Sequence, residues 1–179
     1  MKITLICLFI FIATMIIGCG ESEDVHDGII PSDWLVVVEK DKKQDIRQLQ
    51  IKSRDGRTRL NLIHTSIKSS HRDLLSVDEL LKVCKKTAME KMGGSSILNK
   101  YESTSFLGYY YTARADNNPS IVELSLSDIC QYYFLVDRTG LNNLVITLKG
   151  NTIDSADYEI AVQLIKKINS NWIYEKFSK

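Results

Sequence analysis

Short turns separate the β-branched segments of this chain, and they leave little choice of strand direction. Asp55-Gly56 lies between segments 46–53 and 57–65, which place Leu49 and Ile51 against Leu60 and Leu62. Glycine accepts the positive φ of a tight turn, so this pair predicts a hairpin. Strands joined by so short a connection must run antiparallel. The sequence therefore predicts an antiparallel sheet.

Two segments have helical rather than alternating periodicity. Residues 76–92 carry a capping box, Ser76-x-x-Glu79, and apolar residues at helical spacing, with Gly93 as the expected stop. A second helix is predicted over 154–169. Its apolar stripe is Tyr158, Ala161, Val162, Ile165 and Ile168.

The remaining segments predict strands, and the C-terminal tail, with alternating Trp172, Tyr174 and Phe177, is expected to pack back onto the domain. The predicted strands are Trp34–Glu39, 46–53, 57–65, 96–103, 105–114, 120–126, 129–137 and 141–149. This pattern predicts an α+β fold, with an antiparallel β-sheet of about six to eight strands and two amphipathic helices packed on it. Residues 31–179 form one domain in this interpretation.

Charge excludes one class of function. The chain has 179 residues, with 23 Lys+Arg against 22 Asp+Glu and a formal net charge of +1. A protein that binds nucleic acid by bulk electrostatics needs a clear excess of cations. No nucleic-acid partner is therefore predicted.

The first nineteen residues have the layout of a secretory signal. Lys2 is followed by an uncharged apolar run from Ile3 to Ile17, and then by Gly18 and Cys19. The run is shorter than the roughly 20 apolar residues that a membrane-spanning helix needs. The alternative interpretations are a buried core helix and an ordinary signal peptide without lipid.

The sequence Ile16-Ile17-Gly18-Cys19 resembles the lipobox of bacterial lipoproteins, with Ile in place of the usual leucine. The resemblance implies that residues 1–18 are a cleaved signal peptide and that Cys19 is acylated. Gly20 after the cysteine implies the outer membrane, with the domain facing the periplasm. Residues 19–30 would then be the lipidated cysteine and an acidic tether, at most about 40 Å long. The membrane is thus one expected partner, reached through the lipid.

The element order resembles a second family. Pro31-Ser32-Asp33-Trp34 at a strand start, three strands, a helix, a meander and a closing helix are similar to the PsbP-like fold. Small envelope lipoproteins of the DcrB type share it. The resemblance implies a protein-binding or accessory role and transfers no functional residue.

Motifs for chemistry are missing from the sequence. It has three histidines, His26, His64 and His71, but no HExxH, no CxxC and no glycine-rich phosphate loop. We therefore expect no catalytic residues, no cofactor and no metal. A non-enzymatic protein is predicted.

Two cysteines remain once Cys7 in the signal and the acylated Cys19 are set aside. Cys84 lies on the apolar face of the first helix, and Cys130 shares a strand face with Tyr132 and Phe134. An oxidising periplasm permits a Cys84–Cys130 disulfide. Two buried free thiols are the alternative, because cysteine is often a small core residue.

Aromatic residues supply the candidate binding face. Strand alternation places Tyr110, Arg114, Gln131 and Tyr133 on one semi-polar face. Tyrosine and arginine are common in protein-binding hot spots. The alternative is that the tyrosines only pack a helix against the sheet. Lysines on the outer face of the first helix (Lys82, Lys85, Lys86) indicate either a basic docking patch or an ordinary solvated face.

These features favour a non-catalytic, lipid-anchored module that binds a protein, in its sharpest form an immunity protein that neutralises a secreted toxin. Two other functions remain open. One is an envelope accessory lipoprotein that supports a transport, assembly or stress complex, and the other is a lipoprotein that binds a small molecule.

Overall fold

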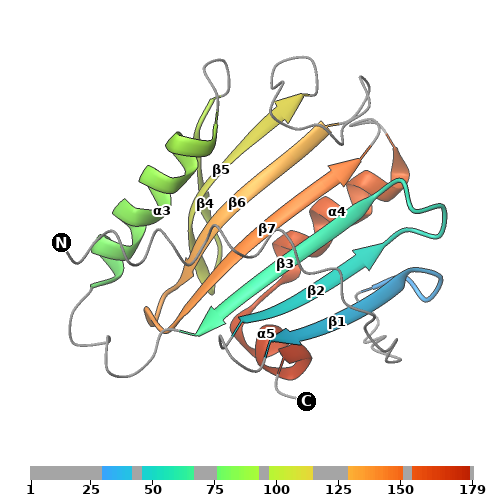
Figure 1. The fold of residues 1–179 in the computed structure, drawn as a ribbon, viewed down its shortest axis with the longest axis horizontal. Helices are drawn as coiled ribbons and strands as arrows, with labels where there is room; N and C mark the ends of the chain where they lie inside the picture. Colours follow the sequence, from blue (N-terminus) through green and yellow to red (C-terminus); the bar gives the residue numbers. More distant parts are fainter. Residues whose placement is uncertain are drawn as a thin grey trace.

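The computed structural model describes residues 30–41, 46–66, 76–92, 97–114, 129–150 and 155–177. Within them the strands form one seven-stranded sheet in the order β1-β2-β3-β7-β6-β5-β4 (Figure 1). Every neighbouring pair is antiparallel. The strands are β1 (Leu35–Asp41), β2 (Ile46–Lys52), β3 (Arg59–Ser66), β4 (Asn99–Glu102), β5 (Phe106–Arg114), β6 (Ile129–Asp137) and β7 (Asn142–Gly150). The α+β fold with an antiparallel sheet is confirmed.

The β2–β3 hairpin forms at the predicted turn. Its ends are joined by a hydrogen bond from the Ser53 amide to the Thr58 carbonyl at 2.9 Å. Gly56 has a φ of 69°, the left-handed conformation for which glycine is favoured. The register pairs Leu49 with Leu62 and Ile51 with Leu60, as the alternation predicts. The turn takes up residues 53–58, so β3 begins later than expected.

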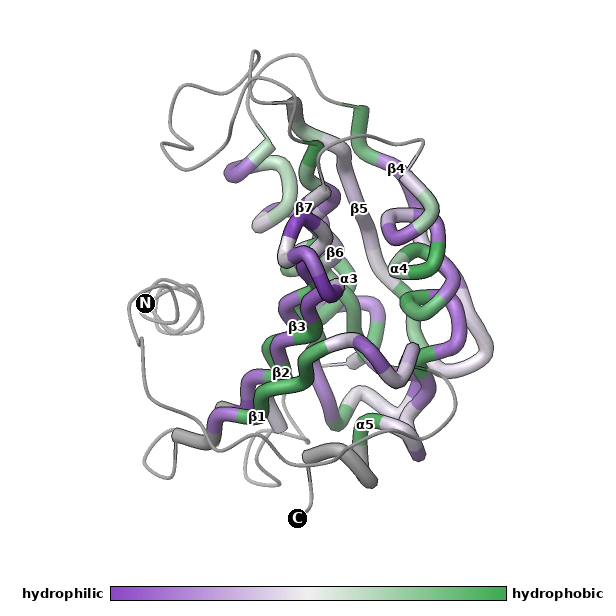
Figure 2. The backbone as a smooth tube through the Cα atoms, turned by 90° about the vertical axis from the view of Figure 1, so that its right-hand side faces the viewer, coloured by the Kyte–Doolittle hydropathy of each residue, from purple (hydrophilic) through white to green (hydrophobic). Residues whose placement is uncertain are grey.

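Two helices pack on one face of the sheet. They are α4 (Ala156–Lys167) and α5 (Ser170–Phe177), and both lie on the same side of the strands in Figure 2. Ser155 caps α4 by accepting a hydrogen bond from the Tyr158 amide. The main core fills the space between these helices and the sheet. Its least exposed members include Leu49, Ile51, Leu62, Leu144, Ile146, Leu148, Ala161, Leu164 and Ile165.

A third helix, α3 (Val77–Lys91), covers part of the other face. It begins at the predicted capping box, in which Ser76 and Glu79 each bind the other's backbone. Its contacts are with β5 and β6, where Ala88 packs in a second cluster with Tyr111, Ala113 and Phe134. Helices on both faces explain why the central strands are apolar on both sides.

Some predicted features differ from the structure, and others lie outside its described part. The tail is a helix, α5, in which Trp172 and Ile173 are buried, rather than an alternating segment. The strand expected over 96–103 is shorter, at Asn99–Glu102. The strand expected over 120–126, the helix stop at Gly93, the signal, Cys19 and the tether lie outside the described residues. None of the described helices is long and apolar enough to span a membrane.

Candidate functional site

Of the predicted binding face, Tyr133 lies in the core, and Tyr110 and Gln131 are partly buried. The register pairs Tyr110 with Tyr133 and Thr112 with Gln131, so alternation correctly places these side chains on one face. That face is the one under α4 and α5, and Tyr133 is only 5% exposed. For Tyr133 the structure therefore matches the alternative interpretation, in which tyrosine packs a helix against the sheet. The side chain of Arg114 lies outside the described part.

Tyr133 is fixed by its neighbours. Its ring stacks on Tyr110 at 5.1 Å between centroids and meets the edge of Tyr101 at 5.6 Å. Its hydroxyl donates to Oε1 of Gln131 at 2.7 Å. Burial, together with the neighbouring tyrosines, raises the pKa of Tyr133. These contacts join β4, β5 and β6 through the packed rings of Tyr101, Tyr110 and Tyr133.

Neither Cys84 nor Cys130 forms a disulfide in the structure. Cys84 packs against the cluster beneath α3. Cys130 is buried and has the strand parity of Tyr132 and Phe134, which belong to the same layer. The two cysteines thus lie on one side of the sheet, as predicted, but the disulfide is not formed.

Thiol counting checks this arrangement. We expect two reactive thiols per chain when residues 22–179 are denatured in guanidinium chloride without reductant. In the native state we expect slow reaction at neutral pH, because burial raises the pKa of Cys84 to about 12. A count of zero thiols in denaturant would show that Cys84 and Cys130 are bridged.

A buried polar chain lies at the opposite ends of β3 and β7 from the β2–β3 hairpin. His64 Nε2 lies 2.9 Å from Oδ1 of Asn142, whose Nδ2 donates to Asp137 at 2.6 Å. Asp137 also accepts from the amides of Leu141 and Asn142 and so holds the β6–β7 turn. Because the Asn142 amide is oriented by the carboxylate, the proton of neutral His64 belongs on Nε2. This chain of bonds positions a turn and presents no group to a substrate.

His64 makes stability depend on pH. Burial lowers the pKa of His64 below its usual 6.5; the Asn142 bond and the Asp137 charge oppose this effect, and Arg47 adds to it. The unfolded chain therefore binds a proton at a higher pH than the folded chain. We expect the free energy of unfolding to fall as pH decreases below 6.5, by at most about 1.4 kcal/mol per pH unit from this group.

Urea unfolding at pH 7.5, 6.5 and 5.5 measures this dependence. The control is His64→Gln, which keeps a donor for Asn142 and does not titrate. Its free energy of unfolding should fall less over the same range. Equal slopes for the two proteins would contradict the assignment to His64.

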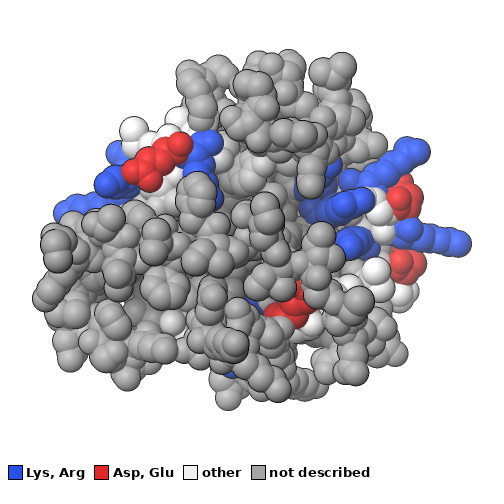
Figure 3. Space-filling model, in the orientation of Figure 1, with Lys and Arg blue, Asp and Glu red and all other residues white. Residues whose placement is uncertain are grey.

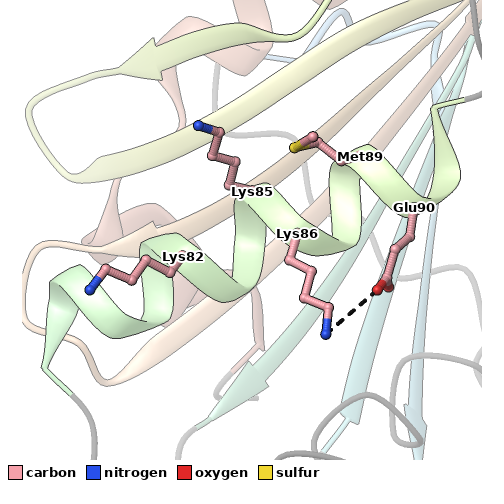
Figure 4. Close-up of a pocket in the computed structure, with 5 residues that line it drawn as sticks. All are labelled: Lys82, Lys85, Lys86, Met89 and Glu90. Carbon is pink, nitrogen blue, oxygen red and sulfur yellow. Dashed lines mark ion pairs between the residues drawn. The ribbon is translucent and has the colours of Figure 1, made fainter.

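The outer face of α3 is the strongest candidate for a binding surface. We call it the α3 outer face and define it by Lys82, Lys85, Lys86, Met89 and Glu90, which line a shallow hollow of about 420 Å³ (Figure 4). Met89 is 56% exposed and points away from the core. Lys86 pairs with Glu90 at 3.8 Å. In the described part of the chain, Lys85 forms no ion pair.

This surface combines an exposed apolar side chain with charged neighbours, and protein interfaces contain both kinds of group. Methionine adapts its shape to different partners. The sequence already indicated the lysines, but Met89 lies off the predicted apolar stripe and was missed. Its signal is a large apolar residue among lysines on the solvent side of an amphipathic helix.

No group of three or more His, Cys, Asp or Glu side chains in the described residues is arranged to hold a metal ion. Compared with protein-family models, curated proteins and solved structures, the chain gives no significant match.

Proposed function

We propose that the protein is a non-catalytic, lipid-anchored module of the bacterial envelope that binds another protein through the α3 outer face. In the sharpest form of the proposal it is an immunity protein, and the partner is a secreted toxin that acts in the periplasm. The location rests on the lipobox resemblance around Cys19 and the acidic tether that follows it.

The observation that carries the proposal is the exposure of Met89 beside three lysines on one helix face. A solvated helix face gains nothing from a large exposed apolar side chain. Burying such a side chain against a partner stabilises a complex by about 1.5–3 kcal/mol. The lysines favour a partner whose contact surface presents carboxylates around an apolar group, because complementary charge speeds association and excludes other partners.

The rest of the molecule acts as a scaffold that holds this surface in place. The face expected to carry the binding tyrosines is occupied by Tyr133 and its neighbours, which pack under α4. The α3 outer face lies on the opposite side of the sheet, and α3 is fixed there by its packing on β5 and β6. A rigid helix presents its side chains with little loss of entropy on binding.

The experiment is capture of partners by the tagged, membrane-anchored chain from envelope and culture supernatant. We expect one stoichiometric secreted protein, retained by the native chain and lost with Met89→Asp. Deletion of the gene should sensitise cells only to a toxin encoded beside it. Resistance to every such toxin after deletion, with no captured protein, would contradict the proposal.

Two other outcomes point to other functions. Capture of an integral outer-membrane complex would indicate an envelope accessory lipoprotein. A small molecule retained in native mass spectrometry would indicate a ligand carrier. We also propose that the fold is of the PsbP-like, DcrB type, supported by the order of three strands, a helix, a meander and closing helices.

A further inference from the structure

Basic side chains gather at the β2–β3 hairpin. Arg54, Arg57 and Arg59 are exposed there, and Lys52 precedes the turn. The strand register places Lys52 opposite Arg59, and Arg59 opposite Lys149, in one cross-strand row. We call Lys52, Arg54, Arg57 and Arg59 the hairpin end. Figure 3 shows blue side chains projecting from the right-hand side of the molecule, with red carboxylate side chains between them.

Carboxylates cancel this charge only in part. Asp55 pairs with Arg57 at 3.5 Å in an exposed contact. Asp33 is exposed and lies just before β1, whose first residue, Leu35, pairs with Lys52, so it is at the same end of the sheet. Asp157 and Glu159 belong to α4, on the other face of the sheet. A chain with a net charge of only +1 thus has a strongly uneven charge distribution.

The hairpin end is also where the domain begins. The pairing of Leu35 with Lys52 puts the start of β1 at the same end of the sheet as the hairpin. The described chain starts at Ile30, a few residues earlier. The segment that joins the domain to Cys19 therefore enters at this end. A tether of residues 19–30 is about 17–20 Å long as a flexible coil.

We propose that the hairpin end rests on the anionic phospholipid headgroups of the membrane that anchors the chain. The proposal depends on the lipid anchor that is part of the proposed function. Clustered Lys and Arg near a membrane surface are attracted to anionic lipid over about one Debye length, 8–10 Å. The lipid attaches the chain to the membrane, and the arginines orient the domain relative to the membrane surface.

This orientation has a consequence for the α3 outer face. In Figure 1 the β2–β3 hairpin and α3 lie at opposite sides of the molecule. With the hairpin end on the membrane, α3 lies on the side of the molecule that is remote from the membrane. A partner in the periplasm then reaches Met89 without competing with the membrane.

Arginine footprinting of the full mature lipoprotein in vesicles tests the orientation. The vesicles are phosphatidylcholine alone or phosphatidylcholine with phosphatidylglycerol, and the reagent is phenylglyoxal, read by peptide mass spectrometry. We expect Arg54 and Arg57 to react at least about five-fold more slowly on the anionic vesicles, and high salt to remove the difference. Arg138 lies in the β6–β7 turn at the other end of β7, and its rate should not change.

Two variants make the test specific. Lys52→Gln with Arg59→Gln should abolish most of the protection of Arg54 and Arg57. Lys85→Gln with Lys86→Gln, which removes the same charge from α3, should retain it. The proposal would be overturned if Arg54 and Arg57, like Arg138, each reacted at the same rate on anionic vesicles as on neutral ones. Failure of the mature chain to float with neutral vesicles would instead refute the lipid anchor.

Discussion

Gly108→Ala is expected to lower the free energy of unfolding by about 3 kcal/mol. Gly108 lies in β5 opposite Leu135 of β6, on the face that α4 covers. A Cβ atom at this position would collide with the carbonyl oxygen of Phe134 and lie 2.9 Å from both Cα and Cδ2 of Leu135. Two of these three atoms belong to the backbone of a central strand, so the strand itself must move. Urea unfolding monitored by far-UV circular dichroism measures the loss.

The matched control is Gly56→Ala in the β2–β3 turn. An added Cβ there meets no atom within 4 Å, but Gly56 has a φ of +69°. Its cost is therefore backbone strain alone, about 1 kcal/mol. A loss at Gly108 no larger than the loss at Gly56 would contradict the close packing of β5 on β6.

Ile146→Ala is expected to lower the free energy of unfolding by about 3–4 kcal/mol. Ile146 is 0% exposed, and it lies in the central strand β7 between Leu62 on β3 and Tyr133 on β6. Removal of its outer carbons leaves a cavity beneath α4 that rigid neighbours on three sides cannot fill. The cost therefore includes both lost burial and the empty volume.

Leu35→Ala is the control for Ile146. Leu35 is half exposed and lies in the edge strand β1, so its truncation removes little buried surface. We expect a loss of less than about 1 kcal/mol from this variant. Similar losses for the two variants would mean that the space between the sheet and α4 is not the main core.

Local chemistry explains which parts of the fold were predictable. Asp55-Gly56 and the Ser76–Glu79 capping box act through hydrogen bonds and dihedral angles within a few residues, and both form as expected. Alternation is equally local, so it correctly placed Tyr110 and Tyr133 on one face. It carries no information on which helix covers that face. The position of α4 depends on contacts between distant segments, and this is why Tyr133, which was predicted at a surface, lies in the core.

The candidate surface was harder to predict than the fold. The lysines of α3 were visible in the sequence, but a solvated helix face has the same composition. Met89 distinguishes the two cases only when its exposure is known, because Met in a helix is more often buried. The role of His64 was hidden for a related reason. Its partners Asn142 and Asp137 are far away in the chain and meet it only through the sheet.

The central claim is that the α3 outer face binds a protein partner, and a comparison of two aspartate substitutions tests it most directly. The partner captured with the native chain is titrated against Met89→Asp and against Ile160→Asp. Ile160 is a matched control, because it is 38% exposed and lines a shallow hollow on α4, on the other side of the sheet. We predict that Met89→Asp weakens binding at least about thirty-fold, equivalent to about 2 kcal/mol, and that Ile160→Asp leaves it unchanged. Equal affinities of Met89→Asp and the native chain for that partner would contradict the account.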